Sequence, residues 1–255
     1  MPTASLVDQL NTTFPDLTIE QRITQIGALF AKPVFTTSLG LEDQLITMFV
    51  AAHARSIAVV TLQTGRLFPQ TLDLIETTQD RYALAIKRYE PTPADIETYA
   101  ASYGLNGFYE SVEARKACCA VRKLVPLAQA LKGADAWITG LRREQSDNRS
   151  DVAFAEFDEA RGLVKLNPLV DLSTEALQEL ITDNDIPINT LHARGYPSIG
   201  CEPCTRAIKP GEPERAGRWW WEHESKQECG LHLENTAETP PREASTSTPL
   251  ETPHA

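Results

Sequence analysis

The chain has 255 residues, of which 42% are hydrophobic, and a formal net charge of −11 at pH 7. This acidic balance argues against a nucleic-acid partner, which needs a basic surface. No apolar run approaches the roughly 20 residues that span a bilayer, and acidic residues near the N-terminus argue against a secretory signal. We therefore expect a cytoplasmic protein with no membrane partner, in which reduced cysteines bind metal or carry out redox chemistry.

Helical and strand-like patterns alternate along the first three quarters of the chain. Residues 1–30 form a helical segment interrupted at Pro15. The expected strands are 33–40, 57–62, 84–89 and 136–140, and the expected helices are 42–54, 69–81, 93–103, 118–131 and 172–183. A hairpin or two edge strands are expected at 154–157 and 163–166. This order predicts an α/β fold, an open, mostly parallel twisted sheet with helices on both faces.

Four of the five cysteines form two close pairs. Cys118 and Cys119 are expected to open a helix, and Cys201 and Cys204 have the spacing of a chelating turn. Thiolates bind both zinc and iron–sulfur clusters, but adjacent cysteines suit a cluster better because its ligand positions lie further apart. The sequence favours a cluster, with zinc and unliganded thiols as the alternatives.

The residues after the cysteine pair are basic. Arg122 and Lys123 each follow a cysteine by four residues and would share its helix face. They could stabilise an anionic cluster and attract an anionic substrate, or they could be an ordinary solvated pair.

Two turns follow neighbouring expected strands. The first contains Ser38, Gly40 and Asp43, and the second contains Thr64, Gly65 and Arg66. The carboxyl ends of parallel strands bind nucleotides, and the N-terminus of a helix binds anions. Taken alone, the first turn is more typical of a plain connection in which Glu42 and Asp43 complement the helix dipole, and the second turn strengthens the anion-binding interpretation.

Basic residues also gather in the later connections of this acidic chain. This clustering suggests a pocket for a phosphate or sulfate group, although any single one of these residues is more often a surface residue than a ligand. The residues are Arg142, Arg143, Arg149, Arg194, Arg206, Lys209, Arg215 and Arg218. Cys229 is unpaired, lies near His232, and is either a nucleophilic thiol or an incidental surface residue.

Together these motifs resemble the assimilatory adenylyl-sulfate (APS) reductases, within the family that also contains the 3′-phosphoadenylyl-sulfate (PAPS) reductases. The resemblance covers about residues 30–232 and rests on the two cysteine pairs, the turn at 38–43, the block 64–69 and the end 228–232. It implies an adenine nucleotide alpha-hydrolase-like fold with a modified phosphate loop. It also implies a [4Fe-4S] cluster on Cys118, Cys119, Cys201 and Cys204.

The resemblance further implies a reaction. APS would be reduced to sulfite and AMP through an S-sulfocysteine on Cys229, with electrons from thioredoxin or a glutaredoxin-like protein. The implied substrate-binding residues are Ser38, Gly40, Asp43, Thr64, Gly65, Arg66, Lys123, Arg142, Arg215, Arg218 and His232. Gln63 and Gln70 stand where the family usually has acids, which affects the expected nucleotide contacts. A homo-oligomer is compatible with this interpretation.

Three other functions stay open at this stage. A PAPS reductase would keep the end 228–232 but typically lacks the four paired cysteines. A non-catalytic iron–sulfur or nucleotide-binding regulator would leave Cys229 without a role. An ATP pyrophosphatase of the same fold would have more Gly and Ser in its phosphate loop.

The predicted organisation has four regions. A helical segment at 1–30 precedes a nucleotide-binding α/β domain with the iron–sulfur site at 31–209. A catalytic segment at 210–233 would move between substrate and reductant. The tail at 234–255 is rich in Thr, Pro and Glu without aromatics, a composition typical of disorder.

Overall fold

The computed structural model describes residues 4–145 and 149–222 and contains a six-stranded sheet in the order β3-β2-β1-β4-β6-β5. All neighbouring strands are parallel except β5 and β6, which form the expected antiparallel pair. The strands are β1 (Pro33–Thr37), β2 (Ala58–Leu62), β3 (Ile86–Tyr89), β4 (Ala136–Ile138), β5 (Ala155–Asp158) and β6 (Leu163–Leu166). The predicted α/β class is confirmed.

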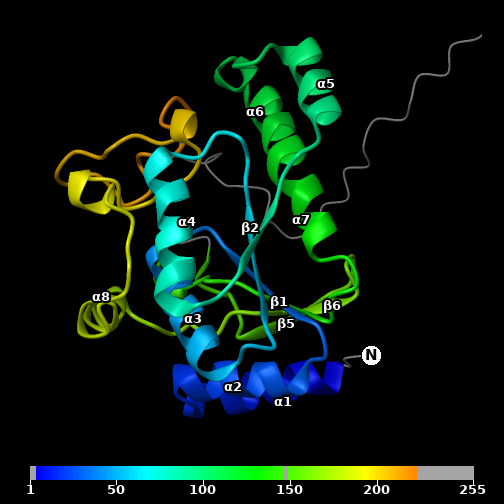
Figure 1. Cartoon of the computed structure of the whole chain (residues 1–255), viewed down its shortest axis with the longest axis vertical. Coiled ribbons are helices and arrows are strands. Elements are labelled where there is room, and N and C mark those ends of the chain that lie inside the picture. The colour runs from blue at the N-terminus through cyan, green and yellow to red at the C-terminus, as the bar shows by residue number, and fades with distance from the viewer. Residues whose placement is uncertain (1–3, 146–148, 223–255) are drawn as a thin grey trace, which may run out of the picture.

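Eight α-helices surround or extend this sheet in the described part of the chain (Figure 1). They are α1 (Ala4–Thr13), α2 (Ile19–Leu29), α3 (Leu41–His53), α4 (Pro69–Tyr82), α5 (Pro93–Tyr103), α6 (Val112–Cys119), α7 (Val125–Ala130) and α8 (Thr174–Asp183). Most expected helices agree with these bounds to within about two residues. None of the helices among residues 4–145 and 149–222 is both long and apolar enough to cross a membrane.

Alternating side chains on the strands build two cores, one on each face of the sheet. Phe35 and Val59 point to the larger core, which also contains apolar residues of α2, α3, α4 and α8. Val34 and Val60, their sequence neighbours, point to the smaller core and pack with Leu127 of α7. The buried strands therefore read as continuous apolar runs, as parallel strands covered on both faces require.

The N-terminal helices are fixed to the antiparallel edge of the sheet. The guanidinium of Arg22, 4% exposed, donates to both carboxylate oxygens of Asp171 at 2.7 and 2.8 Å. Asn11 exchanges two hydrogen bonds of 2.9 Å with the backbone of Ala155, the first residue of β5. Figure 1 shows α1 and α2 at the opposite end of the molecule from α5 and α6. The cysteine-bearing helix α6 is therefore remote from the N-terminal helices.

The strand order places a switch point between β1 and β4. From β1 the chain moves outward to β2 and β3, and from β4 it moves the other way to β6. Connections leave a crevice at such a point, outside the carboxyl ends of the strands. The residues after β1, β2 and β4 therefore face one space.

Candidate functional site

All four paired cysteines line one cavity. Side chains from the same two segments line it with them, namely Arg115, Arg122, Lys123 and Pro203. Three other segments contribute Arg66, Phe108 and Trp219. Cys118, Cys201 and Cys204 are buried, and Cys119 is half-buried. The described residues contain no group of three or more His, Cys, Asp or Glu that converges as a single metal ion requires. The four cysteines share this cavity all the same.

The cysteine pair ends a helix, so the prediction that it opens one was wrong. Helix α6 begins after Ser111, whose hydroxyl accepts from the N–H of Ala114 at 3.0 Å. After Cys119 the chain makes one π-helical turn (Ala120–Leu124), in which the N–H of Val125 reaches back five residues to the carbonyl of Ala120. Such turns are frequent at functional sites.

Pro126 gives the physical reason for this wider turn. A proline inside a continuous helix cannot donate a hydrogen bond to the residue four earlier, and its ring crowds that carbonyl. Here the carbonyl belongs to Arg122. The π-helical turn spreads the residues between the cysteines and α7 and changes the directions of Arg122 and Lys123.

Arg122 joins the cysteine cavity to the turn after β2. Its Nη1 donates to the carbonyl of Thr64 at 2.7 Å. The hydroxyl of Thr64 lies 3.3 Å from the sulfur of Cys201. Gly65 has φ +70°, and its Cα faces the Arg122 guanidinium so closely that a Cβ would lie 3.3 Å from Nη1. Gly65 therefore allows the left-handed backbone of the turn and leaves room for the Arg122 guanidinium.

Burial controls the acidity of the cysteine thiols. Desolvation raises the pKa of Cys204 to about 12, with the neighbouring Cys201 adding to the effect. Desolvation also raises the pKa of Cys118, although Arg122 opposes it. Thiolates become stable here when a bound cation or cluster replaces their protons.

A second and larger cavity, of about 240 Å³, lies at the carboxyl ends of β1, β2 and β4. Ser38, Gly40, Asp43 and Thr64 line it, as do four cationic residues, Lys123, Arg149, Arg215 and Arg218. Lys123 also lines the cysteine cavity, so the two cavities adjoin.

The turn after β1 is organised around Asp43. One oxygen of this carboxylate accepts from both the N–H and the hydroxyl of Ser38, at 2.6 and 2.7 Å. Leu39 between them has a left-handed φ of 62°. Burial raises the pKa of Asp43 to about 6, and the hydrogen bonds from Ser38 oppose this shift. Asp43 thus shapes the turn through the donors of Ser38.

Gly140, which follows β4, lines the larger cavity beside Asp43, and no side chain fits at this position. A Cβ at this position would lie 2.3 Å from Oδ1 of Asp43. Thr139, beside it, donates its hydroxyl to Asn167 at 2.6 Å. The sequence interpretation did not select Thr139 and Gly140, although they follow the strand that neighbours β1.

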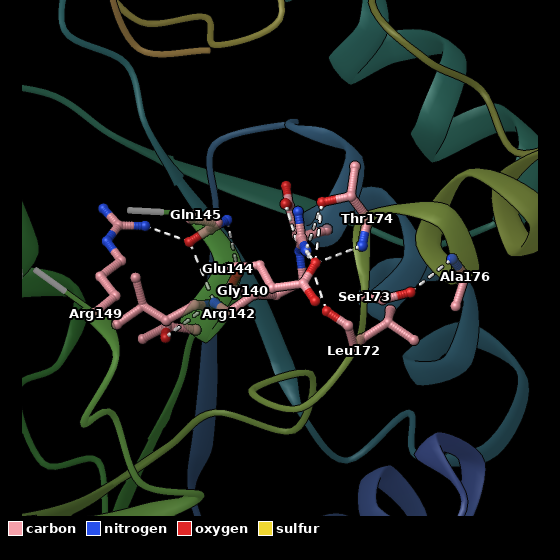
Figure 2. A network of polar contacts seen from close by, with 12 residues as sticks. Gly140, Arg142, Glu144, Gln145, Arg149, Leu172, Ser173, Thr174 and Ala176 are labelled. Atoms are coloured by element: carbon pink, nitrogen blue, oxygen red, sulfur yellow. Dashed lines mark hydrogen bonds and ion pairs between the residues drawn. The ribbon is translucent and has the colours of Figure 1, made fainter. Parts of the chain in front are cut away.

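Arg142 does not line the larger cavity, unlike the other two arginines expected near an anion. Its side chain is buried, its Nε donates to Glu42 at 2.9 Å, and its Nη1 donates to the carbonyl of Leu172 at 3.1 Å. Figure 2 shows this network extending from Arg149 and Gln145 to the start of α8. The geometry assigns Arg142 to holding the loop after β4.

Arg66 and Gly65 are also absent from the lining of the larger cavity. Arg66 turns toward the cysteine cavity, where its guanidinium stacks on Phe108 at 5.9 Å and donates to the carbonyl of Leu105 at 3.3 Å. Its backbone carbonyl accepts from the N–H of Glu202 at 2.7 Å. Arg66 thereby connects the turn after β2 to the second cysteine pair.

Arg218 lines the larger cavity beside Gly200, next to the second cysteine pair. Its Nη1 donates to the hydroxyl of Ser198 at 3.3 Å, and a Cβ on Gly200 would lie 2.3 Å from its Nη2. Gly200 therefore leaves the space that this buried guanidinium occupies, one residue before Cys201. Arg215 reaches the same cavity from the preceding turn.

Two acidic or titratable residues of the cavity were not selected from the sequence. Glu214 lines it, and burial raises the pKa of this carboxyl, with Glu42 adding to the shift. His192 also lines it, and its Nδ1 lies 2.9 Å from the carbonyl of Tyr196. In the sequence, Arg215 and Arg218 were the residues near Glu214 that indicated an anion site, and no motif singled out Glu214 or His192. Cys229 and His232 lie outside the described residues.

The cavity at the switch point and the adjoining cysteine site define an α/β protein of the adenine nucleotide alpha-hydrolase type with a thiol centre. The family model of the phosphoadenosine phosphosulfate reductase domain matches residues 32–207. The chain belongs to this family.

Curated relatives match over most of the chain. An adenosine 5′-phosphosulfate reductase of Agrobacterium fabrum is 58% identical over 91% of this chain and 89% of its own length. One from Allochromatium vinosum is 51% identical over 82% of this chain and 81% of its own length.

Solved structures support the fold. A phosphoadenylyl-sulfate reductase from Candida auris, in a phosphate complex, superposes with a TM-score of 0.70 at 25% identity. That match covers 82% of this chain and 98% of the other. An FMN adenylyltransferase from Candida glabrata has a TM-score of 0.52 at 14% identity, covering 89% of this chain and 80% of its own, and shows the shared fold alone.

Proposed function

We propose that this protein reduces APS to sulfite and AMP with electrons from a dithiol protein such as thioredoxin. The observation that carries the proposal is the adjacency of the two cavities. Lys123 lines both the four-cysteine cavity and the cationic cavity at the sheet's switch point. Relatives named adenosine 5′-phosphosulfate reductase are more than 50% identical to this chain over most of its length.

The four cysteines fit a [4Fe-4S] cluster better than a single ion. Their donor set is soft, all four line one cavity, and the cations Arg122 and Lys123 line it with them. Cys118, Cys119, Cys201 and Cys204 would hold the cluster. When bound, it would supply a fixed anionic charge and a rigid link between the segments that carry these cysteines.

The cationic residues would bind the phosphosulfate. Lys123, Arg149, Arg215 and Arg218 line one cavity and suit an anionic group. The turn after β1 would contact the nucleotide, while Asp43 keeps that turn in shape. Arg142 would act indirectly, by holding the loop after β4 through Glu42.

Cys229 would be the nucleophile. Its thiolate would attack the sulfur of APS, forming an S–S bond as the bond from sulfur to the phosphate oxygen breaks. The electron pair of that bond would leave with AMP, whose developing charge the cations stabilise. A thiolate of the reductant would then attack the sulfur of Cys229 and form a mixed disulfide, as the S–S bond to the sulfonate breaks and its electron pair leaves with sulfite. The second thiol of the dithiol protein would displace Cys229 from this mixed disulfide and leave the reductant oxidised. His232 would assist near the nucleophile, and the cytoplasm would supply the reductant.

A single-turnover experiment tests this function. Anaerobically purified protein is mixed with APS without reductant, and AMP and the mass of the Cys229 peptide are measured. We expect one AMP per active site and a sulfonate on Cys229, followed by sulfite when thioredoxin is added. Cys229→Ser should retain the visible absorbance of the cluster and release no AMP. Sulfite release by this variant would contradict the proposal, because it would show that Cys229 is not the nucleophile.

PAPS reduction is the second candidate, because the family model and the Candida auris structure carry that name. The same measurement with APS and PAPS side by side separates them. We expect a clear preference for APS, and a preference for PAPS would reverse the substrate assignment.

A further inference from the structure

We propose that the buried ion pair between Arg115 and Glu222 positions the start of the C-terminal segment, and so determines where Cys229 can reach. The inference deepens the proposed function and rests on Cys229 being its nucleophile. Arg115 and Glu222 are positioning residues in this reaction, because neither lines the larger cavity.

The ion pair has the geometry of a structural anchor. Nε of Arg115 donates to one carboxylate oxygen of Glu222 at 2.9 Å, and Nη2 donates to the other at 2.8 Å. The two side chains are only 1% and 3% exposed. Two parallel hydrogen bonds fix the orientation of both planes, and burial removes the competition from water.

The anchor lies against the cysteine site. Arg115 precedes Cys118 by three residues on α6, and both side chains line the cysteine cavity. Residues three apart on a helix share a face. A cluster bound by Cys118 would therefore fix the helix face that holds Glu222.

Trp219 forms the second part of the anchor. Its side chain is 0% exposed, its N–H donates to the carbonyl of Cys204 at 3.1 Å, and its carbonyl accepts from the N–H of Glu222 at 2.8 Å. The guanidinium carbons of Arg115 and Arg218 lie 4.9 and 4.8 Å from the Trp219 ring system. The segment start is thus bound to the second cysteine pair as well as to α6.

The backbone of Trp219 adds an independent observation. Its φ of 45° is left-handed, which is unfavourable for a bulky residue and persists only where surrounding contacts determine it. The chain therefore turns sharply at Trp219, between Arg218 in the larger cavity and Glu222 beside the cysteines. This turn fixes the position of Glu222 relative to the two cavities.

The distance along the chain makes this starting point important. Cys229 follows Glu222 by seven residues, and a fully extended chain of that length spans at most roughly 25 Å. The effective concentration of a tethered nucleophile depends on whether its linker matches the required span. Breaking the ion pair would free Glu222 from α6 and would lower the effective concentration of Cys229 at the substrate.

Glu222→Gln and Arg115→Lys test the inference in the full-length, cluster-loaded protein. The matched control is Glu212→Gln, which breaks the half-exposed bidentate pair of Glu212 with Arg206 in the same region. Three quantities are measured for each protein: AMP affinity, visible cluster absorbance, and the single-turnover rate of AMP release from APS. We expect both test variants to slow AMP release at least tenfold, with AMP affinity within twofold of wild type and the absorbance retained. Glu212→Gln should match wild type in all three.

Two results would overturn the inference. One is a rate of AMP release within twofold of wild type in both test variants. The other is loss of cluster absorbance or of AMP affinity in both, because the pair would then support the fold rather than the reach of Cys229. The wild-type protein separates this inference from the proposed function: if it forms no sulfonate on Cys229, the function itself fails.

Discussion

At the scale of single residues, the larger cavity depends on positions where side chains are absent. Gly140 and Gly200 each face a charged group so closely that a Cβ would lie 2.3 Å from it. Both glycines line the larger cavity and let the backbone approach these charged groups closely. Because these positions are closely packed, an added methyl group must displace the neighbouring side chains.

Gly140→Ala should destabilise the protein and weaken AMP binding. The new methyl group would displace Asp43 and disturb its two hydrogen bonds to Ser38, at a cost of about 1–3 kcal/mol in the free energy of unfolding. Denaturant unfolding and AMP titration measure the two effects. Gly40→Ala is the control for stability, because the nearest atom to its Cβ would lie 3.5 Å away. Equal unfolding free energies for both variants would contradict the packing argument.

Asp43→Asn should change how stability depends on pH. Burial raises the pKa of Asp43 from 3.8 to about 6, so the folded state binds a proton more tightly than the unfolded state does. The resulting stabilisation is complete below about pH 4 and is lost as pH rises through 6. An asparagine oxygen can still accept from Ser38 without carrying a charge. The stability of Asp43→Asn relative to wild type should therefore increase by roughly 2 kcal/mol as pH rises from 4 to 7.

Measuring the unfolding free energies of wild type and Asp43→Asn between pH 5 and 7.5 captures most of this change. Asp73→Asn, on the exposed side of α4, removes a similar charge and should show no comparable trend. If the stability of Asp43→Asn relative to wild type stays constant across this range, the pKa of Asp43 is not raised in the folded protein.

At the scale of secondary structure, the π-helical turn between α6 and α7 determines how the basic residues face the cysteines. It occupies Ala120–Leu124 and ends just before Pro126. Arg122 then reaches the carbonyl of Thr64, and Lys123 reaches both cavities. The positions of these cations depend on an irregular turn that regular helical spacing does not describe.

Pro126→Ala should preserve or raise stability while lowering the affinity for APS about tenfold. Alanine supplies the N–H that proline lacks, so the carbonyl of Arg122 can regain a helical hydrogen bond and the turn can tighten. The tightened turn would rotate Lys123 away from its position between the cavities. Thermal unfolding and APS binding to the Cys229→Ser form measure the two properties. Val125→Ala, at an exposed neighbouring position, should leave both unchanged. Unaltered APS affinity in Pro126→Ala would contradict this role of the turn.

The same turn shows what the sequence could and could not predict. Apolar runs and caps predicted the strands and most helices, because parallel strands buried on both faces and capped helices have strong local patterns. The start of α6 was missed, since Ser111 and the apolar residues after it gave a weaker signal than the cysteines. The expected strand at 84–89 is shorter in the structure because β3 begins at Ile86, near the edge of the sheet.

The structure brings together the predicted residues whose positions follow from strand order, and it places apart those whose positions depend on side-chain direction. The turns after β1 and β2 do meet in one cavity, as the carboxyl ends of parallel strands require. Arg142 and Arg66 were expected to bind substrate, but they turn toward Glu42 and Phe108. Their direction depends on residues far away in the chain, which local patterns cannot supply.

At the scale of the whole molecule, the cysteine site joins segments that the sheet alone does not hold. Cys118 belongs to α6, Cys201 pairs with Leu67 in an isolated antiparallel bridge, and Trp219 bonds to Cys204. A group bound to all four sulfurs would hold these segments together. Binding to the folded form alone stabilises a protein by mass action.

Removing iron with a chelator under anaerobic conditions should lower the melting temperature by several degrees and increase amide exchange in residues 112–124 and 198–222. The central strands should keep their protection, because their cores lie on the faces of the sheet. Differential scanning calorimetry and hydrogen exchange measure these effects. Cys229→Ser, treated in the same way, is the control and should lose the same stability. Unchanged exchange in both regions would show that the metal does not join them.

The bridge between Leu67 and Cys201 also bears on how the protein is made. Thr64 and Cys201 are 137 positions apart, and contacts at such separation form late because a long loop must first close. The first cysteine pair leaves the ribosome well before the second, and the pairs meet only after the sheet between them has assembled. For the cluster proposed above, iron delivery should therefore act on a nearly complete chain. Newly made protein starved of iron should then accumulate as a compact precursor that can still take up the cluster.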